Sequence, residues 1–120
     1  MKEGARILVV DDDPEIVRML ARSLGRHGLQ IDTTSSAEDA LVRAGNTPYD
    51  AALLDLVMPG RDGADLAAEL RKTLPGLPIG LLTGYAHSPL IPAALKSGVA
   101  VFKKPVIIQE LVEFLEAEIR

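Results

Sequence analysis

The sequence predicts an α/β fold: a doubly wound parallel sheet of five strands with helices on both faces. Five short apolar runs alternate with five amphipathic segments, and this alternation is typical of a parallel sheet that helices cover on both sides. Right-handed crossovers between successive strands make such a sheet doubly wound. The core must be aliphatic, because the chain has two Phe, two Tyr and no Trp within a hydrophobic content of 48%. Its length fits one domain, residues 1–120.

The first apolar run, residues 7–10, is rich in β-branched residues and predicts a buried strand. Asp13 and Pro14 follow as a helix N-cap and a proline at the first helical position. Gly28 stands where this helix should stop. The apolar stripe of the helix consists of Ile16, Val17, Leu20 and Leu24. Residues 30–34 are predicted to form the second strand.

A capping-box spacing opens the second helix, since Ser36 is followed three residues later by Asp39. We expect this helix to reach Ala44 and to end at Gly45. The third strand is predicted at residues 51–55, which are apolar except for the last. Each of these assignments rests on a local signal for where an element starts or stops.

Residues 58–63 are rich in Gly and Pro and predict a loop, followed by a helix at residues 65–72. The fourth strand is predicted at residues 79–83, and the helix after it ends near Gly98. The start of that helix is not fixed by the pattern, because Pro89 and Pro92 both lie there.

The last two predicted elements are a fifth strand at residues 100–103 and an amphipathic helix at residues 108–119. One face of this helix carries Leu111, Val112, Leu115 and Ile119.

Composition excludes several classes of protein. The absence of cysteine rules out disulfides and thiolate metal sites, and it fits a reducing cytoplasm, where we expect the chain to act. The net charge of -4, with no basic run longer than Lys103-Lys104, predicts no direct binding to nucleic acid or to an anionic membrane. No signal peptide and no run of membrane-spanning length is visible.

Polar groups follow the predicted strands at their carboxyl ends. They are Asp11, Asp12 and Asp13 after the first strand, Asp55 in the third, Thr83 in the fourth and Lys104 after the fifth. In doubly wound sheets these ends share one edge, where ligands bind near the point at which strand order reverses. Carboxylates that converge there repel one another without a cation, and their oxygens suit Mg²⁺. Capping of the first helix is the purely structural explanation, and it accounts for one acid, Asp13.

Asp55 is the sharpest of these signals, because aspartate is depleted in strands and here it ends the run Ala-Ala-Leu-Leu. Thr83 and Lys104 are weak signals alone and gain value by sharing an edge with Asp55. A metal-bound carboxylate beside a lysine and a hydroxyl indicates phosphoryl chemistry with an aspartyl nucleophile. The cation and the lysine would offset charge on the transferring oxygens.

Five segments of the chain resemble the receiver domain of two-component response regulators. They are "ILVVDDDPEI", "DAALLDLVMPGRDG", "GLLTGY", "ALKSG" and "FKKP", in the order and spacing of that family. The resemblance implies a flavodoxin-like fold with strand order 2-1-3-4-5. It also implies a phosphorylation-dependent signalling switch that takes its phosphoryl group from a sensor histidine kinase or a histidine phosphotransfer protein. Such a domain catalyses only its own Mg²⁺-dependent phosphorylation and dephosphorylation.

Residue by residue, the resemblance makes Asp55 the phosphoacceptor. It implies that Asp12, Asp55 and the backbone carbonyl of Val57 bind Mg²⁺ directly, and that Asp11 acts mainly through metal-bound water. It gives Thr83 a hydrogen bond to the phosphoryl group after transfer.

The resemblance also pairs Lys104 first with Asp55 and then with the phosphoryl group, and it implies a cis peptide bond between Lys104 and Pro105. A homodimer or downstream effector would use the fourth helix, fifth strand and fifth helix.

The chain departs from the family at the switch position, which is Val101 instead of an aromatic residue. Phe102 is one step along the strand and is expected on the opposite, core-facing side. Valine is too small and stiff for the usual ring rotation, so we expect coupling from Thr83 through the backbone of residues 84–88, with Tyr85 as a possible lever. Lys103, His27 and His87 are expected to be surface residues.

Three other functions stay open on the residues alone. An aspartyl phosphatase usually follows its first strand with an Asp-x-Asp nucleophile pair and carries a cap for substrate, whereas here the candidate nucleophile is on the third strand and we expect no segment to be left over for a cap. Flavin or nucleotide binding needs a phosphate loop rich in small residues, where this chain has three acids. A degenerate receiver used only for docking would not need the full set of Asp11, Asp12, Asp55, Thr83 and Lys104.

Overall fold

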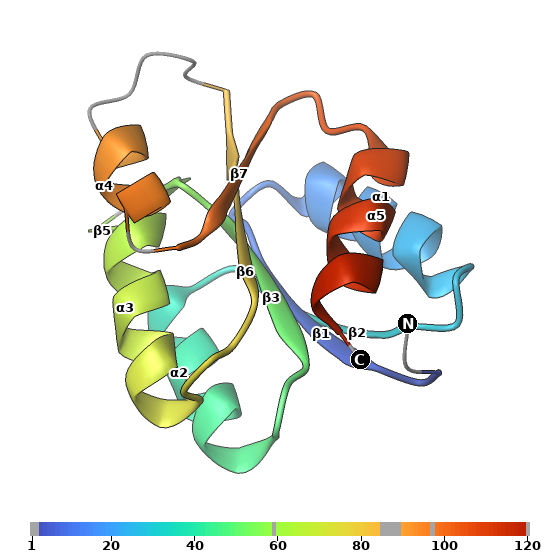
Figure 1. Ribbon diagram of the computed structural model, residues 1–120, viewed down its shortest axis with the longest axis horizontal. Coiled ribbons are helices and arrows are strands. Elements are labelled where there is room, and N and C mark those ends of the chain that lie inside the picture. The colour runs from blue at the N-terminus through green and yellow to red at the C-terminus, as the bar shows by residue number, and fades with distance from the viewer. Residues whose placement is uncertain (1–2, 59, 85–89, 97, 120) are drawn as a thin grey trace.

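The computed structural model describes residues 3–58, 60–84, 90–96 and 98–119. A five-stranded parallel sheet has the order β2-β1-β3-β6-β7 (Figure 1). Its strands are β1 (Arg6–Val10), β2 (Gln30–Thr34), β3 (Ala51–Asp55), β6 (Ile79–Thr83) and β7 (Ala100–Lys103). The helices are α1 (Pro14–Gly25), α2 (Ala37–Asn46), α3 (Gly63–Thr73), α4 (Leu90–Lys96) and α5 (Ile108–Glu118). Two short strands, β4 (Val57–Met58) and β5 (Arg61–Asp62), pair outside the main sheet. Without them, the order is the predicted 2-1-3-4-5.

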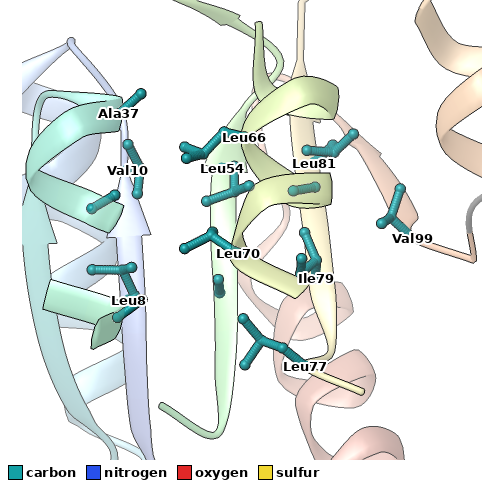
Figure 2. Close-up of a cluster of buried hydrophobic side chains, with 14 of the residues drawn as sticks. Leu8, Val10, Ala37, Leu54, Leu66, Leu70, Leu77, Ile79, Leu81 and Val99 are labelled. Carbon is teal, nitrogen blue, oxygen red and sulfur yellow. The ribbon is translucent and has the colours of Figure 1, made fainter. Parts of the chain in front are cut away.

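Alternation along the strands gives the sheet two apolar faces. In β1, Leu8 and Val10 pack with the cluster beneath α2 and α3, whereas Ile7 and Val9 pack with the cluster beneath α1 and α5. Figure 1 shows α2, α3 and α4 on one side of the sheet and α1 and α5 on the other. Figure 2 shows the first cluster, where Leu54 of β3 lies among side chains from the helices and neighbouring strands. The fold prediction is therefore confirmed, including helices on both faces.

The helix starts predicted from caps are confirmed, while two predicted helix ends are wrong. Asp13 and Ser36 cap α1 and α2. α1 ends at Gly25, three residues before Gly28, which has a φ of 78° in the turn that follows. α2 continues through Gly45 to Asn46, because an exposed glycine near a helix end costs too little to stop it.

The segment predicted as a loop at residues 58–63 contains an antiparallel hairpin. Val57 pairs with Asp62, and Met58 pairs with Arg61 next to the turn. Asp62 then caps α3 by accepting a 2.7 Å hydrogen bond from the backbone N–H of Asp65. This cap starts α3 at Gly63, two residues earlier than predicted.

The last elements follow the prediction closely. α4 spans only seven residues, with Pro92 in its first turn, where the missing N–H has no helical partner to lose. Val101 and Phe102 contact opposite clusters, as expected from their adjacent positions in β7. The Phe102 ring lies edge-on to Phe114 of α5, with centroids 5.4 Å apart and planes at 68°. Over the described ranges, no helix has both the length and the hydropathy needed to cross a bilayer.

Candidate functional site

The carboxyl ends of the central strands form one edge with a hollow of about 470 Å³. It is lined by Asp11, Asp12, Asp13, Asp55, Val57, Gly84 and Lys104. β1 lies between β2 and β3, so strand order reverses here, and the hollow opens where doubly wound folds bind ligands. Residues separated by most of the chain therefore meet at a single place.

Three carboxylates in this hollow are close enough to share one cation. Asp11, Asp12 and Asp55 each offer an oxygen, and these oxygens all lie within 4.8 Å of one another. Asp11 and Asp55 are 1% and 7% exposed, whereas Asp12 is open to solvent. Two nearly buried acids and one exposed acid fit a hard divalent cation that retains some water. The residues present therefore fit a metal ion.

Asp13 is held away from this group by its structural role. Its carboxylate accepts a 2.9 Å hydrogen bond from the backbone N–H of Glu15, and its own backbone N–H donates to Asp11 Oδ1 at 2.9 Å. The same three-residue turn thus orients Asp11 into the hollow and points Asp13 at the helix end. The capping role predicted for Asp13 is confirmed, and the other two acids remain close to Asp55.

Lys104 lies between the two buried acids. Its Nζ is 3.1 Å from Asp11 Oδ2 and 3.3 Å from Asp55 Oδ1. The backbone N–H of Lys104 donates to the Thr83 carbonyl at 2.7 Å, and the peptide bond to Pro105 is cis. The sequence suggested the pairing with Asp55 but missed the shorter one with Asp11, because strand order alone does not say which acid the amine reaches.

Burial and charge shift the pKa values of this pair. Burial, and then the negative charge of Asp11, raise the pKa of Asp55 above its ordinary value, against the opposing effects of Lys104 and the Val57 N–H. Burial alone would lower the pKa of Lys104, but its hydrogen bond to Asp11 and the two carboxylate charges outweigh burial and raise it. The edge therefore carries excess negative charge that one ammonium group does not offset.

Thr83 ends β6, the strand next to β3, and is 1% exposed, whereas its neighbour Gly84 lines the hollow. Val101 is half-buried in β7, and its neighbour Lys103 is exposed, as is His27. Tyr85 and His87, and most of the loop expected to couple to Thr83, lie outside the described residues. The sequence analysis gave no role to Gly63, although this residue ends both the Gly-rich stretch and the matched segment "DAALLDLVMPGRDG".

The strand order and the acidic hollow at the carboxyl edge define a flavodoxin-like receiver fold. The chain belongs to the response regulator receiver domain family, whose model matches residues 7–116. Members of this family act in two-component systems as signalling switches, interact with histidine kinases, and are typically phosphorylated and bind Mg²⁺.

Individual relatives agree with this assignment. The chain is 39% identical over 80 residues to the transcriptional regulatory protein TcrA of Mycobacterium tuberculosis. The aligned region covers 67% of this chain and 32% of TcrA. It is 35% identical over 116 residues to the response regulator MprA of a Mycobacterium species, covering 96% of this chain and 50% of MprA. The chain thus spans about a third to a half of these relatives. The chemotaxis protein CheY4 of Vibrio cholerae superposes with a TM-score of 0.85 at 26% identity, covering 96% and 98% of the two chains.

Proposed function

We propose that residues 1–120 form a single receiver unit in which Asp55 accepts a phosphoryl group from a sensor histidine kinase or a histidine phosphotransfer protein. One observation carries this proposal: a nearly buried aspartate stands within 3.3 Å of a lysine amine, at the edge of a three-acid cluster. A carboxylate in this position can act as a nucleophile, and the amine lies where charge develops on the transferred group.

The proposed cofactor is Mg²⁺, held directly by Asp12, Asp55 and the backbone carbonyl of Val57, with Asp11 acting through bound water. When bound, the ion would neutralise charge on the phosphoryl oxygens. Support comes from the proximity of the three carboxylates and from the place of Val57 in the wall of the same hollow.

In the proposed transfer, an oxygen of Asp55 forms a bond to phosphorus while the bond from phosphorus to the donor's imidazole nitrogen breaks. Asp55 Oδ1 accepts from the Val57 N–H at 3.2 Å and faces Lys104, so these contacts fix the orientation of the carboxylate. After transfer, the ammonium group of Lys104 would pair with the phosphoryl oxygens instead of the Asp55 carboxylate. The hydroxyl of Thr83 would donate a hydrogen bond to one of them.

The proposed switch acts on itself and on partners, without a separate substrate. Its autocatalysis covers both gain and loss of the phosphoryl group. Its output surface would be α4, β7 and α5, available to a second copy or a downstream effector, and its location the cytoplasm.

Asp55→Asn tests the phosphoacceptor assignment. Wild-type protein incubated with acetyl phosphate or phosphoramidate and Mg²⁺ should gain one phosphoryl group by intact mass, and the variant should gain none. Asp65→Asn is the matched control, because Asp65 is an exposed acid outside the hollow and its loss should leave phosphorylation intact. Metal-dependent gain at the wild-type rate in Asp55→Asn would overturn the assignment, and a wild type that gains nothing would favour a docking module.

A further inference from the structure

Gly63 begins α3 in direct contact with the segment that carries the site. Its backbone N–H donates to the Leu56 carbonyl at 2.8 Å. A Cβ added to Gly63 would lie 2.9 Å from the Leu56 Cα and 3.1 Å from the Asp55 carbonyl carbon, and closer still to the Asp55 carbonyl oxygen. Real Cβ atoms essentially never come within 3.0 Å of such atoms, so a side chain here would force something to move. The φ of Gly63 is not positive, so space and not backbone conformation requires glycine.

The atoms that would have to move are backbone atoms, which distinguishes Gly63 from the other tightly packed glycine. At Gly80, a Cβ would meet the Phe102 ring at 2.9 Å and Leu53 Cδ2 at 3.0 Å, both of which are side-chain atoms. Side chains relieve such contacts by rotating, whereas the main chain of Asp55 is held in β3 and the Leu56 N–H is bonded to the Leu82 carbonyl at 2.9 Å. A Cβ at Gly63 therefore pushes on the main chain of the acid itself.

The same segment is closed at both ends. Val57 pairs with Asp62 in the β4–β5 hairpin, and Asp62 caps α3. The loop made by residues 55–58 and 60–63 thus leaves the sheet after Asp55 and returns at Gly63 to contact Asp55 and Leu56. The Asp55 carboxylate and the Val57 carbonyl belong to the residues on either side of Leu56, whose backbone Gly63 contacts, so a shift of Leu56 would move one group relative to the other.

We propose that Gly63 is a positioning residue for the metal site, because its missing side chain lets α3 close against Asp55 and Leu56. This inference rests on the proposed function, since it concerns binding of Mg²⁺ by Asp55 and Val57. The smallest side chain at position 63 opens the loop, displaces both ligand groups and weakens metal binding.

The test compares three glycine-to-alanine variants by isothermal titration of metal-free protein with Mg²⁺, with urea unfolding alongside. Gly63→Ala should weaken Mg²⁺ binding by roughly tenfold or more, the usual effect of losing a group that orients metal ligands. Gly80→Ala should lose stability and keep its metal affinity, which separates positioning from general destabilisation. Gly45→Ala, a helical position with open space around the new methyl group, should keep its metal affinity and unfold at an equal or slightly higher urea concentration. Unchanged affinity in Gly63→Ala overturns the inference alone, whereas a wild type that binds no Mg²⁺ overturns the proposed function with it.

A second measurement uses the wild type and decides the matter if Gly63→Ala does not fold. Because coupling between binding and conformation is reciprocal, a metal ion that binds more tightly when Gly63 contacts Asp55 and Leu56 must also stabilise that contact. At a Mg²⁺ concentration about ten times the dissociation constant, hydrogen exchange at the Gly63 amide should therefore slow by about tenfold. The amide of Gly45, at the exposed end of α2, should exchange at its original rate. A Gly63 amide that ignores saturating Mg²⁺ would contradict the inference.

Discussion

Asp12 and Asp13 are chemically identical neighbours that the fold gives different tasks. Asp13 has extended backbone and caps α1, while Asp12 turns its carboxylate toward Asp11 and Asp55. A single residue step separates a contribution to stability from a contribution to the site. The sequence supported this split because proline at the first helical position marks the residue before it as the cap.

Substitution of these two acids should separate the two tasks. Asp13→Ala should lower the free energy of unfolding by about 1 kcal/mol through loss of the cap, with Mg²⁺ affinity retained. Asp12→Ala should weaken Mg²⁺ binding and phosphorylation together and leave stability near the wild-type value. Urea unfolding without metal and calorimetric titration measure the two effects, and a reversed ranking would contradict the assignment.

At the scale of elements, β7 is tied to α5 through an aromatic contact on the face away from Val101. Phe102 fits because Gly80 of the neighbouring strand has no side chain, and its ring then meets Phe114. Position 101, where the family usually has an aromatic residue, is valine in this chain. The adjacent Phe102 instead contacts Phe114 and so joins β7 to α5.

A double-mutant cycle measures this anchor. The rings of Phe102 and Phe114 should show a coupling of about 1 kcal/mol between Phe102→Leu and Phe114→Leu in urea unfolding, since an edge-on pair adds to the burial of each ring. Additive effects of the two substitutions would show that the rings contribute by burial alone.

The response to phosphorylation should be concentrated between β6 and β7. Hydrogen exchange with and without the phosphoryl mimic beryllofluoride should differ most over residues 84–102, because a seven-residue helix offers few bonds to hold this region. Amide spectra should shift strongly at residues 84–86 and weakly at Val101. A changed Val101 rotamer beside an unchanged loop, or changes confined to α1 and α2, would count against this route.

Elements with strong local signals were predictable, and those that depend on tertiary contact were not. The strand at residues 51–55 was predictable from four consecutive apolar residues, and α1 from its cap and apolar stripe. The hairpin of β4 and β5 has two-residue strands, which are too short to show any periodicity in the sequence. Likewise, α2 continues past Gly45 because the free energy that one glycine costs a helix is too small to end it.

At the scale of the whole molecule, the site is predictable as a location and not as a geometry. Parallel strand order places Asp11, Asp55 and Lys104 at one edge, since carboxyl ends of parallel strands coincide. Which carboxylate receives the amine at 3.1 Å depends on side-chain packing that no sequence pattern encodes. The same is true of Gly63, which acts only through its distance from another segment.

The stability of the whole molecule should depend on the ionisation of Asp55. Its pKa is raised in the folded state from an ordinary value of 3.8, so the folded protein holds this proton to higher pH than the unfolded chain does. The stability linked to Asp55 is therefore fully present below pH 3.8 and is lost as pH rises through the folded-state pKa. At pH 7 without metal, Asp55→Asn should have a larger free energy of unfolding than the wild type. This difference should shrink as the pH is lowered through the folded-state pKa of Asp55 toward 3.8. Urea midpoints across this range, with EDTA present, measure it, and equal midpoints at neutral pH would contradict it.

The ion pair between Asp11 and Lys104 joins positions 93 residues apart, and this separation has a consequence for biosynthesis. A ribosome delivers every acid of the cluster before it delivers the lysine. A nascent chain that stops short of residue 104 has its aspartates in place but no ammonium group beside them, and no β7 to carry one. The proposed acceptor site therefore gains its ammonium group only near the end of translation of this segment.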